Sequence, residues 1–209
     1  MRRVARLQPV ADLLLQAFRD EDGTMMDAAP TLRGDSEAKP LGQKVKPMQD
    51  TPTPSGNAIA AIVFDRLEAL TAQPRYRDAA AQLLGAFAGS VGRYGIFAAT
   101  MACAMRLHLE RPLHVTIAGS RKSPAARALF DAAVHAYAPH AAVVWVDPDA
   151  PLPAGLPDSA RDFVASFPRD KLPAACVCRR TVCDLPTGDA SELSKQVSSK
   201  VERPEPRAS

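Results

Sequence analysis

Residues 55–71, with the sequence SGNAIAAIVFDRLEALT, decide the fold class of the first half of the chain. Ser55 and Asn57 are residue types favoured where a helix begins. The apolar residues that follow recur every three or four positions, which is the spacing of one helix face. They are Ile59, Ile62, Val63, Leu67 and Leu70. We predict a helix that begins near residue 57 and ends before Pro74.

Further helices are expected on both sides of this one. Residues 8–18 carry an apolar face, with Pro9 tolerated in the first helical turn. A helix from about Tyr76 and another over 96–109 follow, and short connections make such neighbours antiparallel. Residues 24–54 show no sustained period and contain many prolines, so we predict a long loop there. This half of the chain therefore predicts stacked α-hairpins.

The pattern changes at Pro112. Residues 113–119 (LHVTIAG) form a β-branched run that is typical of a strand, a helix is expected from Ser123, and residues 142–146 (AVVWV) form a second apolar strand. The order strand, helix, strand predicts a parallel βαβ unit with a right-handed crossover. A third short strand is expected at 174–178.

Three segments follow from these patterns. The fold class is mainly α with a small α/β part. We assign residues 1–109 to the α-hairpins, residues 110–195 to the α/β segment, and residues 196–209 to a disordered tail.

Composition limits the classes of function. The chain has 209 residues, of which 46% are hydrophobic and 23% charged, and this balance is typical of a globular protein. The net charge of +3 is too small to indicate a nucleic-acid partner. No apolar run approaches the roughly 18 residues of a membrane helix. Four cysteines in a chain of this length do not indicate a disulfide scaffold, so we expect a cytoplasmic location.

The cysteines near the C-terminus are the first candidate for chemistry. Cys176 and Cys178 would share one face of a strand, and four residues separate Cys178 from Cys183. Two arginines after Cys178 would lower the pKa of a neighbouring thiol, which suits a redox pair or half of a metal site. The C-x-x-C redox spacing and a following histidine are missing, so buried structural thiols are the alternative, and we expect neither a metal nor a cofactor. Cys103, inside a helix, is expected to be packed.

Residues 51–57 (TPTPSGN) are the second candidate. Ser55, Gly56 and Asn57 offer hydrogen-bonding groups and close approach at the mouth of a helix, so they could line a pocket. The same residues could simply cap the helix, which is the commoner use of Ser and Asn there. None of the four histidines stands in a recognisable triad arrangement. No catalytic residues are identified.

Five short motifs follow one another along the chain. They are KPMQD at 46–50, PSGNA at 54–58, RYRDAA at 75–80, IAG at 117–119, and C-x4-C-x2-P from Cys178 to Pro186. In this order the chain, over about residues 8–195, resembles the C-terminal part of the thioredoxin-domain-containing family that includes spermatogenesis-associated protein 20. PSGN and C-x4-C-x2-P are the most specific of these motifs.

The resemblance implies a fold and several functions. Family members join a thioredoxin-like domain to an (α/α)6 toroid of the six-hairpin glycosidase type, so this chain would be a fragment of that toroid. It would work with the remainder of the toroid or with a thioredoxin-like domain, would tend to self-associate, and would not be catalytic alone. A complete toroid implies a carbohydrate-active isomerase or hydrolase as one alternative. The other alternative, a thiol redox or metal module using Cys176, Cys178 and Cys183, rests on the cysteines themselves and not on the resemblance.

Overall fold

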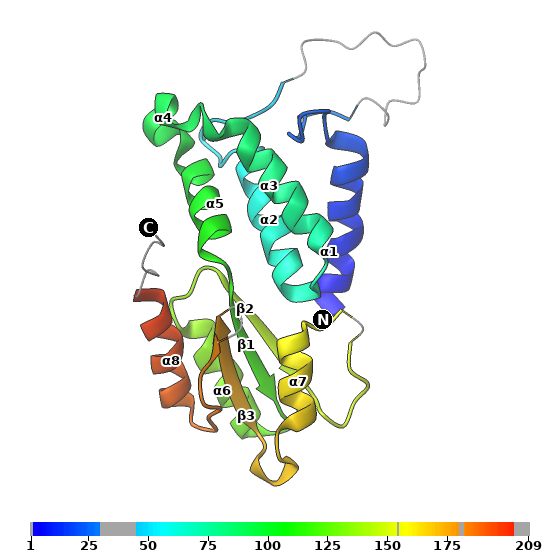
Figure 1. Ribbon diagram of the computed structural model, residues 1–209, viewed down its shortest axis with the longest axis vertical. Helices are drawn as coiled ribbons and strands as arrows, with labels where there is room; N and C mark the ends of the chain where they lie inside the picture. Colours follow the sequence, from blue (N-terminus) through cyan, green and yellow to red (C-terminus); the bar gives the residue numbers. More distant parts are fainter. Residues whose placement is uncertain (1, 30–44, 154, 180–181, 203–209) are drawn as a thin grey trace. The chain divides into compact units, whose positions relative to one another are not determined.

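A computed structural model describes residues 2–29, 45–153, 155–179 and 182–202. The described residues form a mixed α/β structure, about 56% helical, with a four-stranded sheet. It divides into two compact units (Figure 1). Unit 1 comprises residues 1–68 and 73–109, and unit 2 comprises residues 69–72 and 110–209.

Unit 1 is helical. Its elements in chain order are α1 (Arg2–Leu13), the π-helical turn η1 (Leu14–Phe18), α2 (Gly56–Thr71), α3 (Pro74–Ala88), α4 (Val91–Tyr94), the 3₁₀ turn η3 (Gly95–Ala98) and α5 (Ala99–Glu110). The last residues of α2, from 69, and the last residue of α5, Glu110, are grouped with unit 2. The helices predicted over 57–71 and from Tyr76 are confirmed. The helix predicted over 96–109 begins only at Ala99, because the chain first turns at Gly95, whose φ of +52° favours glycine.

The core of unit 1 combines a few large side chains with many alanines. Phe64, Tyr76 and Met101 are fully buried, and the rings of Phe64 and Tyr76 stack with their centroids 6.3 Å apart. Ala58, Ala61 and Ala80 belong to the same core cluster and have no exposed surface. Small side chains at these positions let the helix backbones approach closely.

Unit 2 contains the sheet. Its strands are β1 (Leu113–Ala118), β2 (Ala141–Val146), β3 (Ala174–Arg179) and β4 (Val182–Cys183), and they lie in the sheet in the order β2-β1-β3-β4. Its helices are α6 (Pro124–His135), α7 (Asp158–Ser166), the 3₁₀ turn η4 (Arg169–Lys171) and α8 (Ala190–Glu202). β1 and β2 are parallel and joined through α6, so the predicted βαβ unit is confirmed. β3 runs antiparallel to β1, and β4 runs antiparallel to β3.

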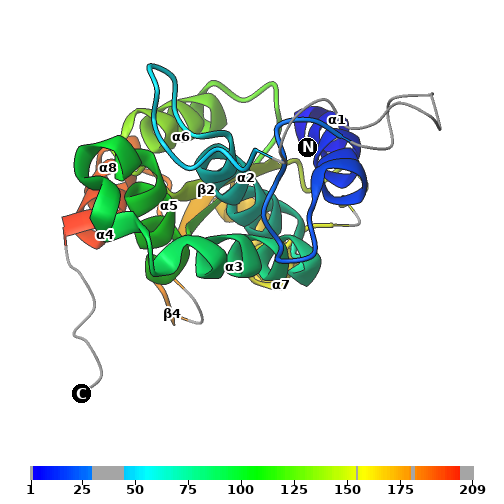
Figure 2. The same ribbon diagram turned by 90° about the horizontal axis from the view of Figure 1, so that it is seen from above.

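The two faces of the sheet are covered by different helices. α6 and α8 pack on the face that carries Val115, Ile117 and Val177. α7 lies on the opposite side of the sheet from α6 (Figure 2). α7 was not predicted, because the prolines that precede it hide a short amphipathic segment.

Two predicted boundaries are wrong. The first helix begins at Arg2 rather than at residue 8, so Pro9 lies inside α1 and not in its first turn. The tail predicted from residue 196 is helical up to Glu202, because Leu193 and Val197 sit four residues apart and are both buried in the core of unit 2. Residues 203–209 lie outside the described residues.

Candidate functional site

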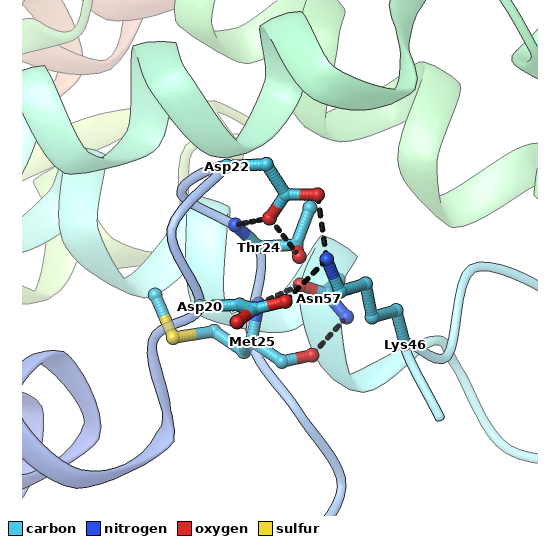
Figure 3. Close-up of polar contacts among 6 residues, drawn as sticks. All are labelled: Asp20, Asp22, Thr24, Met25, Lys46 and Asn57. Atoms are coloured by element: carbon cyan, nitrogen blue, oxygen red, sulfur yellow. Dashed lines mark hydrogen bonds and ion pairs between the residues drawn. The ribbon is translucent and has the colours of Figure 1, made fainter. Parts of the chain in front are cut away.

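Asn57, in the first turn of α2, is the centre of a polar cluster in unit 1. Its side chain is only 1% exposed. The Oδ1 atom accepts a hydrogen bond from the Met25 N–H at 2.7 Å, and Nδ2 donates to the Met25 carbonyl at 2.9 Å (Figure 3). Nδ2 also donates to the Pro47 carbonyl at 2.9 Å. One amide therefore holds two loop segments that have no regular structure of their own.

Ser55 and Asp50 extend this cluster. The Ser55 hydroxyl donates to the Pro47 carbonyl at 2.9 Å and accepts from the Ala58 N–H at 3.3 Å, which caps α2. The Asp50 carboxylate accepts from the Ser55 N–H and the Thr100 N–H, each at 2.8 Å. These N–H donors, Thr100 first, lower the pKa of Asp50. We call Asp50, Ser55 and Asn57 the loop clamp.

An ion pair network fastens the same loops at their outer side. The Lys46 ammonium lies 2.6 Å from Asp20 Oδ2 and 2.6 Å from Asp22 Oδ2 (Figure 3). Thr24 donates to Asp22 Oδ1 from its N–H at 3.0 Å and from its hydroxyl at 2.6 Å. Hydrogen bonds from Lys46 and then Thr24 lower the pKa of Asp22. Hydrogen bonds to Asp20 and then Asp22 raise the pKa of Lys46.

An apolar pocket of about 430 Å³ lies between α1, η1 and the first turns of α2. It is lined by Leu7, Val10, Ala11, Leu14, Phe18, Met25, Met26, Asp27, Pro47, Gly56, Asn57, Ile59, Ala60 and Val63. Of the three predicted pocket residues, Gly56 and Asn57 line this pocket and Ser55 does not. The Asn57 amide is already hydrogen-bonded on both its oxygen and its nitrogen, so the pocket suits apolar groups.

The three C-terminal cysteines come together in unit 2. Cys178 and Cys183 stand opposite each other on β3 and β4 and form a disulfide with an S–S distance of 2.06 Å. The Cys176 sulfur lies 3.6 Å from the Cys178 sulfur, and all three sulfur atoms lie within 4.8 Å of one another. Cys176 and Cys178 are buried, and Cys183 is exposed.

The environment of Cys176 differs from the predicted one. Burial, followed by the nearby Asp184 carboxylate, raises the pKa of the Cys176 thiol, so the predicted lowering by the neighbouring arginines is wrong for this cysteine. Arg179 donates instead to the Lys200 carbonyl on α8. Cys103 also differs from prediction, because it is exposed on α5 rather than packed.

A buried charged group in unit 1 was missed. The Asp65 carboxylate on α2 lies 2.9 Å from His108 Nδ1 on α5 and 3.6 Å from Arg77 Nη1 on α3. Arg77 also donates to the His108 carbonyl at 3.0 Å. This group joins three helices, and its signal in the sequence is an aspartate within the apolar run of α2.

Comparison with protein-family models and with curated proteins finds no match to the chain. The resemblance to the thioredoxin-domain-containing family therefore remains a prediction that rests on the five motifs. Among the described residues, no helix combines the length and the apolar character that crossing a bilayer requires.

Proposed function

We propose that unit 1 is a helix-binding module, and that the pocket between α1 and α2 receives a helix of a further α-hairpin in a larger assembly of the six-hairpin type. The observation that carries this proposal is the apolar pocket with helical walls on two sides. Ten of its lining residues belong to α1, η1 or α2.

The spacing of the wall residues supports a helical occupant. Leu7, Val10 and Leu14 are three and four residues apart along α1 and η1, and Ile59 and Val63 are four apart on α2. Two such rows form a groove into which the ridge of a third helix packs. An occupant with an apolar face needs no polar partner. The Asn57 amide offers none, because its oxygen and nitrogen are already hydrogen-bonded to Met25 and Pro47.

The exposed part of these walls gives the interaction its energy. Leu7, Val10 and Ile59 are 53%, 57% and 42% exposed. Complete burial of such a side chain contributes about 1.5–3 kcal/mol, so covering the exposed parts of all three would contribute roughly 2–5 kcal/mol. Without its partner hairpin the chain is expected to use this surface for self-association.

Sedimentation velocity over a concentration series tests the proposal. We expect the wild-type chain to associate, and Val10→Glu to shift it towards monomer by placing a charge in the groove. Val134→Glu is the matched control, because Val134 is 47% exposed on α6 in unit 2. A wild-type chain that stays monomeric, or association that Val10→Glu leaves unchanged, would contradict the proposal.

The carbohydrate-active alternative rests on the resemblance alone. Sugar sites offer several polar groups to hydroxyls, whereas this pocket has mainly apolar walls. Calorimetry of a complete, reconstituted assembly with a panel of sugars tests that alternative, and the absence of heat would count against it.

A further inference from the structure

We propose that Cys176, Cys178 and Cys183, when all three are reduced, form a binding site for a soft, thiolate-preferring cation such as Zn²⁺. The Cys178–Cys183 disulfide is then the oxidised, metal-free state of the same site. This proposal concerns unit 2 and is independent of the helix-binding function proposed for unit 1.

The distances between the sulfur atoms match such a site. A zinc ion with Zn–S bonds of about 2.3 Å holds tetrahedral sulfur ligands about 3.8 Å apart. The Cys176 and Cys178 sulfurs are already 3.6 Å apart, and the three sulfurs lie within 4.8 Å of one another. Reduction would let the Cys183 sulfur move from bonding distance to ligand distance without a change in strand pairing.

Strand geometry explains why the third sulfur suits a metal better than an alternative disulfide. Residues two apart along a strand have Cα atoms roughly 6.6 Å apart, near the upper limit of roughly 6.8 Å for a disulfide. Cys183 stands opposite Cys178, so it is a diagonal neighbour of Cys176, at roughly 7–8 Å. A metal ion can bind the sulfurs of residues whose Cα atoms are this far apart, because the sulfurs themselves lie within 4.8 Å of one another, whereas a disulfide from Cys176 would require the strand to bend.

Burial gives the site one protected side and one open side. Cys176 and Cys178 are buried in the sheet, and Cys183 is exposed on the edge strand β4. The ion would enter from the side of Cys183 and leave a fourth position for water or a small thiol. The three thiols release their protons as the ion binds.

Oxidation would empty the site in a balanced two-electron step. The Cys178 and Cys183 thiolates give two electrons to hydrogen peroxide, an S–S bond forms, the O–O bond breaks, and two protons from the solvent complete two molecules of water. The ion loses two of its three protein ligands and dissociates. A dithiol reductant returns two electrons to the disulfide and restores the site.

Titration of the full chain with Cd²⁺ tests this inference, because Cd²⁺–thiolate charge transfer is visible in the near ultraviolet. We expect the reduced chain to bind one ion, displaceable by Zn²⁺, and the oxidised chain to bind none. A reduced chain without the charge-transfer band, or an oxidised chain that binds equally, would overturn the proposal.

Single cysteine variants test the three-sulfur composition. Cys176→Ser leaves Cys178 and Cys183 in place and is expected to weaken Cd²⁺ binding by more than tenfold, since even outer-shell changes at metal sites cost about 10–100-fold. Cys103→Ser removes an exposed thiol in unit 1 and should leave affinity unchanged. Circular dichroism confirms that each variant is folded. Unchanged affinity in folded Cys176→Ser, or lost binding in Cys103→Ser, would refute the site.

Discussion

Replacing Asn57 by alanine should destabilise unit 1 more than any exposed substitution in the same loops. The change removes three hydrogen bonds, two to Met25 and one to Pro47. The Pro47 carbonyl keeps its bond from the Ser55 hydroxyl, whereas the N–H and the carbonyl of Met25 lose their side-chain partner. A buried polar group left without a partner costs about 1–3 kcal/mol, so for these two groups we expect a loss of roughly 2–6 kcal/mol.

Urea unfolding followed by far-ultraviolet circular dichroism measures this loss. The matched control is Gln49→Ala, which removes an exposed amide from the segment that contains Pro47 and should change stability by less than about 0.5 kcal/mol. Trp145, the single tryptophan, lies in unit 2, so its fluorescence follows that unit separately. A loss in Asn57→Ala no larger than in the control would refute the assignment of Asn57 as the centre of the loop clamp.

Two further predictions concern the same loops. Gly23→Ala should lower the free energy of unfolding by about 1–3 kcal/mol, because Gly23 has a φ of +86° and a Cβ there would lie 2.9 Å from the Gln82 Cβ. Gly92→Ala is the control, since a Cβ at Gly92 meets nothing within 4 Å. Equal urea midpoints for the two variants would contradict this prediction. The lowered pKa of Asp22 means that its stabilising effect is present above the ordinary value of 3.8 and is lost as the pH falls through the lowered pKa. The stability difference between wild type and Lys46→Met should therefore shrink on acidification, and a difference that stays constant between pH 7 and pH 2.5 would count against the network.

Local patterns in the sequence account for much of the fold. The three- and four-residue spacing in 55–71 predicts α2, and two β-branched runs around Ser123 predict the βαβ unit, because both signals lie within one element. Ser123 caps α6 by accepting from the Ala126 N–H at 3.3 Å. The direction of β3 could not be predicted in this way, since pairing between distant segments leaves no periodic signal in either of them.

The loop clamp shows the same limit at the site. Ser and Asn at the start of α2 were compatible with a helix cap or with a pocket wall, and the structure divides the roles. Ser55 caps the helix, while Asn57 both lines the pocket and binds loop backbone. The acceptors of Asn57 are carbonyls of Met25 and Pro47, and any residue type presents such carbonyls, so sequence could not identify them.

At the cysteines, the alternation of side chains along a strand corrects the prediction made from neighbouring charge. Neighbouring charge predicted a lowered thiol pKa, because Arg179 follows Cys178 directly. The alternation that places Cys176 and Cys178 on one face of β3 also places Arg179 on the other face, where its guanidinium contacts the Lys200 carbonyl of α8. Burial then dominates and raises the pKa of Cys176. For Cys176 and Arg179 the alternation along the strand matters more than closeness in sequence, and the three sulfur atoms, which lie within 4.8 Å of one another, define the chemistry of this edge of the sheet.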